Sequence, residues 1–360
     1  MVPYYILAGV PIYMSLFMMD KGTLTVKRER QKYIIGTFFV ICILLLALRH
    51  ESIGIDLQRY LPFFKSVAQK PWENLFSSYN KETGYLLLNK LIGTLFPSER
   101  FFIIVISLIT MLPLMKLYTE ESENALLTMS IFLILPSFQM LFSGLRQAVA
   151  MALTVPAYYA TRKKKLVWFI ICALLAITFH KSAVVIVLLY PIYHMNITRN
   201  KVILLIPAML ATYVFRRQIF SVLIRFLSDE YEERYGEISE TGAFAMLILF
   251  ALFAIFSYVC ASNEQIDREI IGLRNILLVT VLLQLFATIN PVAMRMNYYF
   301  IIFIPILIPK IINRTPEKDR ALYRALSLVM IVFFLTYHFA KTHSGVDVLS
   351  IYPYKFFWEG

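Results

Sequence analysis

The stretch from residue 166 to residue 193 reads LVWFIICALLAITFHKSAVVIVLLYPIY and is apolar over almost its whole length. Basic clusters flank it on both sides, TRKKK before it and TRNK after it. Because cytoplasmic loops carry an excess of Lys and Arg, two such clusters require an even number of membrane crossings between them. Two helices of about 14 residues would each rise only about 21 Å, short of a hydrocarbon core of about 30 Å. We expect either two helices extended by their flanks or a shallow hairpin, with residues 179–181 at the outward tip or in a cavity open to that side.

The composition of the whole chain also indicates a membrane protein. Hydrophobic residues make up 59% of the 360 residues, aromatic residues make up 15%, and the mean hydropathy is +0.67. These values are far from those of a soluble domain. The formal net charge is +12, but Lys and Arg are dispersed between apolar runs, which argues against nucleic-acid binding. We assign most of this charge to topology and to contact with lipid headgroups in the bilayer.

Further apolar runs predict further spans when about 20 residues are taken as the length of one crossing. They lie near residues 2–19, 33–48, 101–118, 125–142, 145–161, 201–215, 242–261, 273–289, 297–312 and 321–339. Positive charges follow the first run and no cleavage site is visible, so we expect a retained span with the N-terminus outside. The prediction is an all-α polytopic membrane protein with about twelve transmembrane helices. No linker or repeat divides it, so residues 1–360 are expected to form a single membrane domain.

Two predicted outward segments, residues 49–100 and 216–240, are long enough to hold structure. Each carries apolar residues on one face at helical spacing, which predicts helices lying in the membrane interface and covering a cavity. Surface-lying helices without any chemistry are the alternative.

Seven arginines are predicted at or beyond the outward ends of the spans. They are Arg49, Arg59, Arg146, Arg216, Arg217, Arg225 and Arg295. Positive charge is normally kept out of short translocated loops, so these residues indicate an anionic substrate. Arg146 in FSGLRQAVAMAL has no acidic neighbour in the sequence, and burying it costs about 2.5 to 3.5 kcal/mol even on insertion scales. Arg295 in RMNYYF is placed similarly. Snorkelling to lipid phosphate is the alternative, but several guanidinium groups that bind phosphate oxygens in pairs would suit a diphosphate.

Candidate acids and bases stand beside these arginines. In RHESIGIDLQRY, a turn at Gly54 lets Arg49 and Asp56 face the same space, although a self-neutralising pair at the interface is the alternative. Glu82 in KETGYLLLNK is a second outward carboxylate, and capping of a helix explains it equally well. His180 follows Phe179 in AITFHKSAVV, where the adjacent Lys181 favours the neutral imidazole that can accept a proton. A satisfied structural histidine is the alternative there.

At these residues the sequence resembles the bacterial exopolysaccharide and O-antigen polymerases of the EpsG/Wzy type. The matching elements are R-x4-G-x-D-x3-Y at residues 49–60, ETGY at 82–85, GLRQAVAMAL at 144–153, FHKSA at 179–183 and RMNYYF at 295–300. They are spread over most of the chain in consistent order. The resemblance implies a GT-C-like glycosyltransferase that joins oligosaccharide repeat units carried on undecaprenyl diphosphate at the outer face of the bacterial cytoplasmic membrane. It also implies a chain-length regulator and a flippase as possible partners.

The implied reaction assigns roles to the candidate residues. The diphosphate would contact Arg146, Arg295, Arg49 and Arg59. The catalytic candidates are His180, Asp56 and Glu82, with His180 or Asp56 as the base for a sugar hydroxyl. The remaining substrate contacts are expected from Tyr60, Tyr85, Gln147, Lys181, Tyr298 and Tyr299. We expect no metal, since no D-x-D motif is present, and no nucleotide cofactor, since Walker A and GxGxxG motifs are absent.

Two other classes of function remain open. A flippase or exporter for lipid-linked oligosaccharides would also use a cationic cavity, but internal symmetry and central charges would be expected of it. A non-catalytic scaffold of polysaccharide synthesis predicts that single outward arginines are replaceable.

Overall fold

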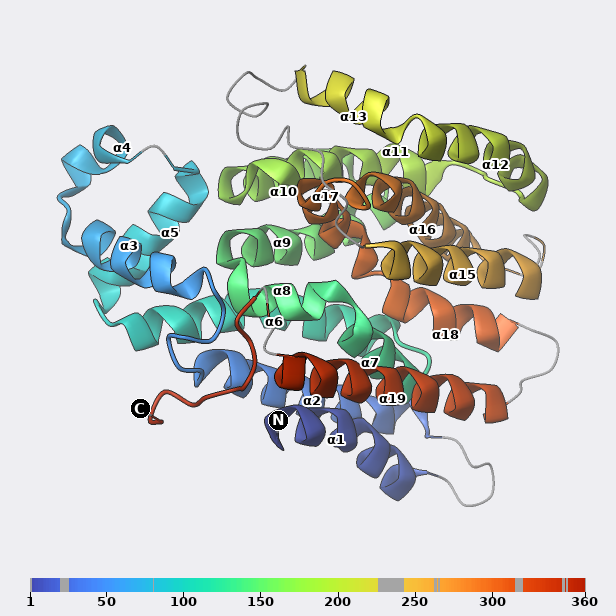
Figure 1. Cartoon of the computed structure of the whole chain (residues 1–360), viewed down its shortest axis with the longest axis horizontal. Helices are drawn as coiled ribbons and strands as arrows, with labels where there is room; N and C mark the ends of the chain where they lie inside the picture. Colours follow the sequence, from blue (N-terminus) through green and yellow to red (C-terminus); the bar gives the residue numbers. More distant parts are fainter. Residues whose placement is uncertain are drawn as a thin grey trace. The chain divides into compact units, whose positions relative to one another are not determined.

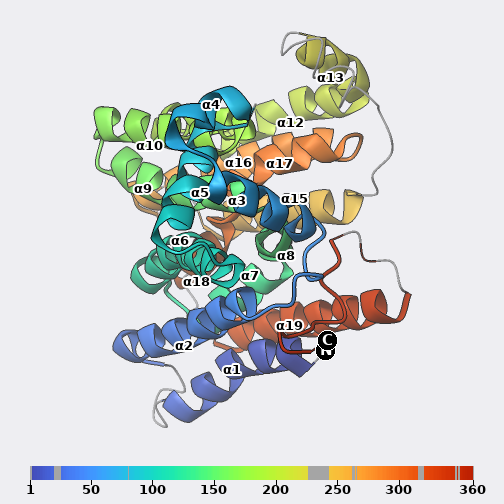
Figure 2. The same ribbon diagram turned by 90° about the vertical axis from the view of Figure 1, so that its left-hand side faces the viewer.

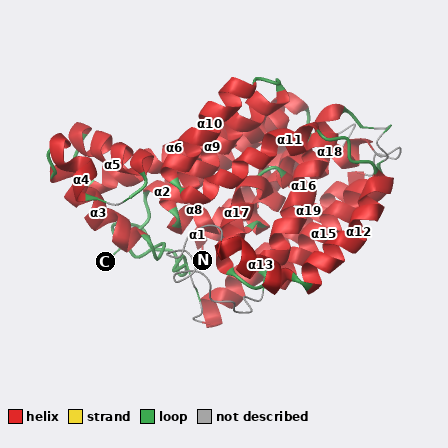
Figure 3. Ribbon diagram, turned by 90° about the horizontal axis from the view of Figure 1, so that it is seen from above, coloured by secondary structure: helices red, strands yellow, loops and turns green. Residues whose placement is uncertain are grey.

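The computed structural model describes the chain except residues 1, 20–25, 80, 226–242, 262–263, 265, 315–319, 345–346, 348 and 360. Within the described residues the elements are helices joined by loops, with no strand (Figure 3). A single antiparallel bridge pairs Arg49 with Phe356. The predicted all-helical class is confirmed.

Two compact units make up the fold, one formed by residues 1–184 with 319–360 and the other by residues 185–318. The first unit contains α1 (Val2–Met18), α2 (Arg28–Ala47), α3 (Leu57–Gln69), η1 (Trp72–Asn74), α4 (Leu75–Ser78), α5 (Thr83–Leu95), α6 (Glu99–Glu121), α7 (Ala125–Ile134), α8 (Pro136–Ser143), α9 (Leu145–Arg162), α10 (Leu166–Phe179) and α19 (Arg320–Ser344) (Figure 1). The second contains α11 (Leu189–His194), α12 (Arg199–Val214), α13 (Arg216–Arg225), α15 (Phe244–Cys260), α16 (Arg268–Ala287), α17 (Pro291–Ile301) and α18 (Ile304–Arg314). The 3-10 helix η2 (Lys181–Leu188) crosses from one unit to the other. A single membrane domain stays a prediction.

Within the described residues, three helices, α2, α6 and α16, are long and apolar enough to cross a membrane, and up to six spans result if three bent helix pairs each count as one. The bent pairs are α7 with α8, α12 with α13, and α17 with α18, with bends of 62°, 75° and 47°. The remaining apolar helices of the described residues are shorter, at 10 to 17 residues. The length and composition of these helices therefore indicate a membrane protein. The prediction of twelve spans is not confirmed by them.

Proline explains why one expected span is bent. The run 125–142 divides at Leu135, because Pro136 opens α8 and disfavours helical geometry in the residue before it.

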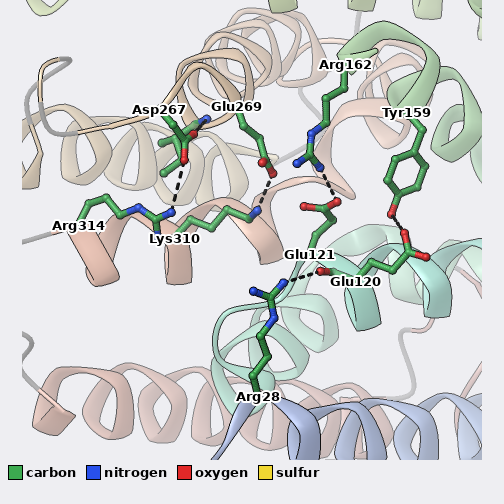
Figure 4. A network of polar contacts seen from close by, with 10 residues as sticks. Arg28, Glu120, Glu121, Tyr159, Arg162, Asp267, Glu269, Lys310 and Arg314 are labelled. Carbon is green, nitrogen blue, oxygen red and sulfur yellow. Dashed lines mark hydrogen bonds and ion pairs between the residues drawn. The ribbon is translucent and has the colours of Figure 1, made fainter.

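The helices α2, α6 and α9 of the first unit are held together at one end by polar contacts (Figure 4). Arg162 Nη1 lies 2.5 Å from Glu121 Oε1, and the Tyr159 hydroxyl donates to Glu120 Oε2 at 2.8 Å. Arg28 Nη2 donates to the carbonyl oxygen of Glu120 at 3.3 Å. The basic clusters at 27–32 and 162–165 therefore lie at the same end of these helices, as expected of a cytoplasmic face.

At the other end of α2, the C-terminal segment 349–357 lies along the loop 48–55 (Figure 1). Backbone hydrogen bonds run from His50 N to Lys355 O at 2.9 Å, from Gly54 N to Ser350 O at 2.8 Å, and from Phe357 N to Leu48 O at 2.9 Å. The Tyr354 hydroxyl donates to the carbonyl oxygen of Leu45 at 2.7 Å. This loop is thus held on a chain segment roughly 300 residues later, which no local pattern in the sequence indicates.

The predicted outward segment 49–100 forms α3 and α5, which lie side by side and pack against α6 (Figure 2). Helix α3 buries Leu57, Leu61, Phe64 and Val67, a spacing that places them on one helical face. Phe64 stacks on Phe102 of α6 with ring centroids 4.5 Å apart. The interfacial position of these helices stays a prediction. In the other predicted segment, α13 covers residues 216–225, and residues 226–240 lie outside the described part.

The second unit is organised around α16. Asn275 Nδ2 donates to the carbonyl oxygens of Ile192 and Met195 at 2.9 and 2.8 Å, which joins α16 to α11 and the loop after it. Lys310 Nζ lies 2.5 Å from Glu269 Oε1, which joins α16 to α18 (Figure 4).

Gly54 is the turn residue on which the loop 48–55 depends. Its φ is +93°, and a Cβ added there would lie 1.9 Å from the carbonyl oxygen of Phe142. We expect Gly54→Ala to lower the free energy of unfolding by about 1 to 3 kcal/mol. The change would be measured as a lower melting temperature of the purified protein. The control is Gly36→Ala in α2, where a Cβ meets nothing within 4 Å and helix propensity predicts a neutral or stabilising change. Equal melting temperatures for the two variants would contradict this account of the loop.

Candidate active site

Arg146 lies in the first turn of α9 and forms an ion pair with Glu82, the residue that precedes α5. Arg146 Nη1 is 2.5 Å from Glu82 Oε2, and the two side chains are 28% and 11% exposed. A cation at a helix N-terminus meets the positive end of the helix dipole. The carboxylate of Glu82 offsets both charges, which explains how an arginine can lie here.

His180 is the second partner of Glu82. It ends α10 in an extended conformation, with φ −156° and ψ 124°, and its Nδ1 is 3.5 Å from Glu82 Oε1, at the outer limit of a hydrogen bond. Helices α5 and α10 approach each other closely at Gly84. A Cβ added to Gly84 would lie only 2.2 Å from Thr178 Oγ1. A glycine two residues after Glu82 therefore lets the carboxylate reach His180 and Arg146 together.

Two tyrosines form an aromatic wall beside the ion pair. The Arg146 guanidinium is 6.0 Å from the ring centroids of both Tyr60 and Tyr85, whose rings are 5.7 Å apart. Burial raises the pKa of Tyr60, although the charge of Arg146 and a hydrogen bond to it act in the opposite direction. The Arg146 guanidinium is therefore positioned by one aromatic ring from α3 and one from α5.

The pKa of Glu82 is lowered to about 2. Burial alone would raise it, but the hydrogen bond with His180 and the charge of Arg146 outweigh that effect. Glu82 is consequently ionised at every physiological pH and holds its partners as a carboxylate.

This shift predicts how stability depends on pH. Because the pKa of Glu82 is lower in the folded than in the unfolded protein, its ionisation stabilises the fold above about pH 4.5, and that contribution is lost as the pH falls toward 2. We expect the difference in melting temperature between wild type and Glu82→Gln, measured in detergent, to shrink as the pH falls from about 4.5 toward 2. A difference that stays constant down to about pH 3 would contradict the shift.

Asp56 lies near the same end of α9, where it is hydrogen-bonded to Ser143. Ser143 Oγ donates to Asp56 Oδ2 at 3.0 Å and accepts from the Asp56 backbone N at 3.4 Å. Ser143 is fully buried and stands three residues before Arg146. It was missed from the sequence because a lone serine between apolar residues carries no distinguishing signal.

Arg49 does not lie with Asp56 in the candidate active site. Its side chain is 1% exposed, lies 5.9 Å from the Phe142 ring, and has no ion pair with Asp56 in the part of the chain that the structure describes. Burial lowers the pKa of Arg49 to about 10. The structure thus places Arg49 beneath the C-terminal segment, and its contact with a diphosphate stays a prediction.

The other predicted site residues are distributed over both units. Arg59 and Lys181 are exposed, and Gln147 is buried in the first turn of α9. Arg295, Tyr298 and Tyr299 lie on α17 in the second unit, with both tyrosines buried, so their part in the site stays a prediction. Among the described side chains, no three His, Cys, Asp or Glu residues are grouped as metal ligands would be, and independence from metal also stays a prediction.

A family model for the EpsG family matches residues 32–356, a range that contains every residue of the cluster around Glu82. The chain belongs to the EpsG family. Membership agrees with the resemblance found in the short sequence elements and indicates a membrane protein of the polysaccharide-polymerase type. No curated protein and no solved structure shows a significant match to the chain.

Proposed function

We propose that this EpsG-family protein is a glycosyltransferase that polymerises undecaprenyl-diphosphate-linked oligosaccharide repeat units at the outer face of the bacterial cytoplasmic membrane. The observation that carries the proposal is the cluster of Glu82, Arg146 and His180. These residues come from three separate sequence elements and meet through contacts of 2.5 and 3.5 Å. A carboxylate, a guanidinium and an imidazole are the groups that such a transfer requires.

The position of the cluster along α9 supports an outward-facing site. Arg146 lies in the first turn of this helix and Arg162 ends it, so 16 helical steps, about 24 Å, separate the cluster from the start of the basic residues 162–165. If the basic residues face the cytoplasm, the cluster lies near the outer surface of the membrane.

Proton transfer is assigned to His180, with Asp56 as the second candidate. The acceptor hydroxyl oxygen attacks the anomeric carbon of the growing chain, the bond from that carbon to the diphosphate breaks, and the electron pair leaves with the diphosphate. The hydroxyl proton passes to the base. When His180 Nδ1 donates to Glu82, Nε2 becomes the basic ring nitrogen, and Glu82 both orients and stabilises the imidazolium that forms.

The role of stabilising the negative charge on the departing diphosphate is assigned first to Arg146. Its guanidinium presents several N–H donors in one plane, and it stands at the N-terminus of α9, where the helix dipole also favours an anion. The exposed Arg59 lies one residue before Tyr60 of the aromatic wall, and Arg295 and Arg49 complete the proposed set. No metal ion is required in this scheme. The GT-C-like architecture with about twelve spans, and association with a flippase and a chain-length regulator, belong to the same proposal.

Glycan analysis of a strain that lacks the protein tests this function. We expect loss of long polymer and accumulation of a single repeat unit on its lipid, accessible to an impermeant glycosidase in spheroplasts, with polymer restored by the wild-type chain. A lipid-linked unit that is protected from that enzyme would favour the flippase alternative. Normal polymer would overturn the proposal.

A further inference from the structure

A cavity of about 300 Å³ lies in the first unit, between the loop after α2, the start of α3, the start of α6 and the C-terminal segment. It is separate from the Glu82 cluster, since none of its lining residues belongs to that cluster. Its volume is at the lower end of the roughly 300 to 1,000 Å³ typical of small-molecule sites. It can therefore hold a small part of a larger substrate.

The cavity has an apolar floor and one aromatic side. Leu61 and Ile103 are buried in the floor, whereas the Phe357 side chain is 45% exposed. The Arg100 guanidinium lies 4.3 Å from the Phe357 ring centroid and is fixed by donating to the carbonyl oxygens of Ala47 and Arg49 at 2.7 and 2.9 Å. A partly exposed ring held in place this way offers a flat surface to a ligand.

The rest of the lining is polar with mixed charge. Glu51 and Glu99 contribute carboxylates, Arg100 contributes a guanidinium and His50 an imidazole. Lys65 Nζ is 2.9 Å from Glu99 Oε1, so the two acids are balanced by two bases. The carboxylates disfavour a diphosphate in this cavity, and the charged lining disfavours a lipid chain. Neutral hydroxyl groups suit it, because they donate to carboxylates and accept from guanidinium.

The N-terminal part of α3 connects the cavity to the candidate active site. Leu61 in the cavity floor directly follows Tyr60, which contacts Arg146. Successive residues of a helix point about 100° apart, so neighbouring side chains of α3 face the two places.

We propose that this cavity is a carbohydrate subsite, which binds one sugar ring of the oligosaccharide at a distance from the reacting bond. Phe357 packs against the C–H face of the ring, while Glu51, Glu99 and Arg100 bind its hydroxyl groups. The inference rests on the proposed polymerase function and deepens it, because a distal subsite retains the growing chain between additions and so influences polymer length.

The test uses membranes containing each variant and, as the probe, lipid-linked repeat unit extracted from the deletion strain. We expect Phe357→Ala to raise KM for this unit roughly 2- to 10-fold, to leave kcat within about two-fold, and to shorten the polymer. Phe357→Trp keeps the aromatic surface and should stay close to wild type. Glu51→Gln, on an exposed side chain, should raise KM without affecting folding.

Phe76→Ala is the matched control, because Phe76 is an exposed phenylalanine of α4 that does not line the cavity. It should leave KM and polymer length unchanged. Unchanged KM and length in Phe357→Ala would overturn the subsite, as would an equal fall of kcat in Phe357→Ala and Phe357→Trp. Failure of the polymerase proposal looks different, since the wild-type protein would then form no polymer from the probe.

Discussion

Replacing Glu82 with Gln is expected to reduce polymer formation by at least about 100-fold, the lower range for loss of an acid–base group. The amide has the same shape as the carboxylate but no charge. Arg146 would lose its acidic partner, and His180 would lose the group that orients its ring and stabilises its protonated form. The measurement is polymer formed per molecule of protein in membranes supplied with lipid-linked repeat units.

The chain offers a matched control at the other end of α9. Glu121 pairs with Arg162 at the same 2.5 Å as Glu82 with Arg146, and its side chain is similarly buried, at 8% against 11% exposed. Glu121→Gln should reduce stability or protein level while polymer formed per molecule stays near that of wild type. If Glu82→Gln retained normal polymer per molecule, or if both variants lost it equally, a catalytic role for Glu82 would be excluded.

Arg146→Lys is expected to have the second large effect, a loss of roughly 100- to 1,000-fold in kcat, by analogy with removal of one donor that stabilises transition-state charge. Lysine keeps the positive charge but cannot present two parallel N–H groups to phosphate oxygens. Arg162→Lys, in the pair at the opposite end of α9, is the control and should retain near-normal kcat. Normal kcat in Arg146→Lys would remove the diphosphate role and leave Arg146 as a structural ion pair.

Exchanging the charges of Glu82 and Arg146 distinguishes a structural role of this ion pair from a role in the reaction. In the double variant Glu82→Arg with Arg146→Glu, the opposite charges can still meet, so the protein level should recover relative to Glu82→Arg alone. Polymer formation should not recover, because the positive charge no longer stands at the N-terminus of α9 and His180 no longer has a carboxylate partner. Recovery of both would show that the pair serves only to join α5 to α9.

The membrane class and the helical fold could be predicted because they depend on composition and on runs of apolar residues. The number of spans could not, since hydropathy detects a run such as 125–142 without showing that Pro136 bends it by 62°. Helix α5 was expected from the one-sided pattern after Glu82, and the structure has a helix from Thr83 to Leu95.

The candidate site was predictable as a set of residue types but not as a geometry. Arg146 stood out because no acid is near it in sequence, yet its partner lies 64 residues earlier. Sequence alone left both capping and catalysis open for Glu82, and the structure adds its two contacts. Ser143 and the C-terminal segment carried no signal, because their contacts with residues 48–56 join parts of the chain 87 or more residues apart.

The backbone pairing of residues 349–357 with residues 48–55 affects biosynthesis. During translation the early loop emerges long before the segment that completes its hydrogen bonds, so its final conformation must wait until residues 349–357 have been synthesised. A stop codon shortly after α19 would leave every transmembrane candidate intact while removing those bonds. Such late nonsense alleles should therefore behave as complete loss of function, and a protease that trims only the tail should inactivate an otherwise inserted molecule.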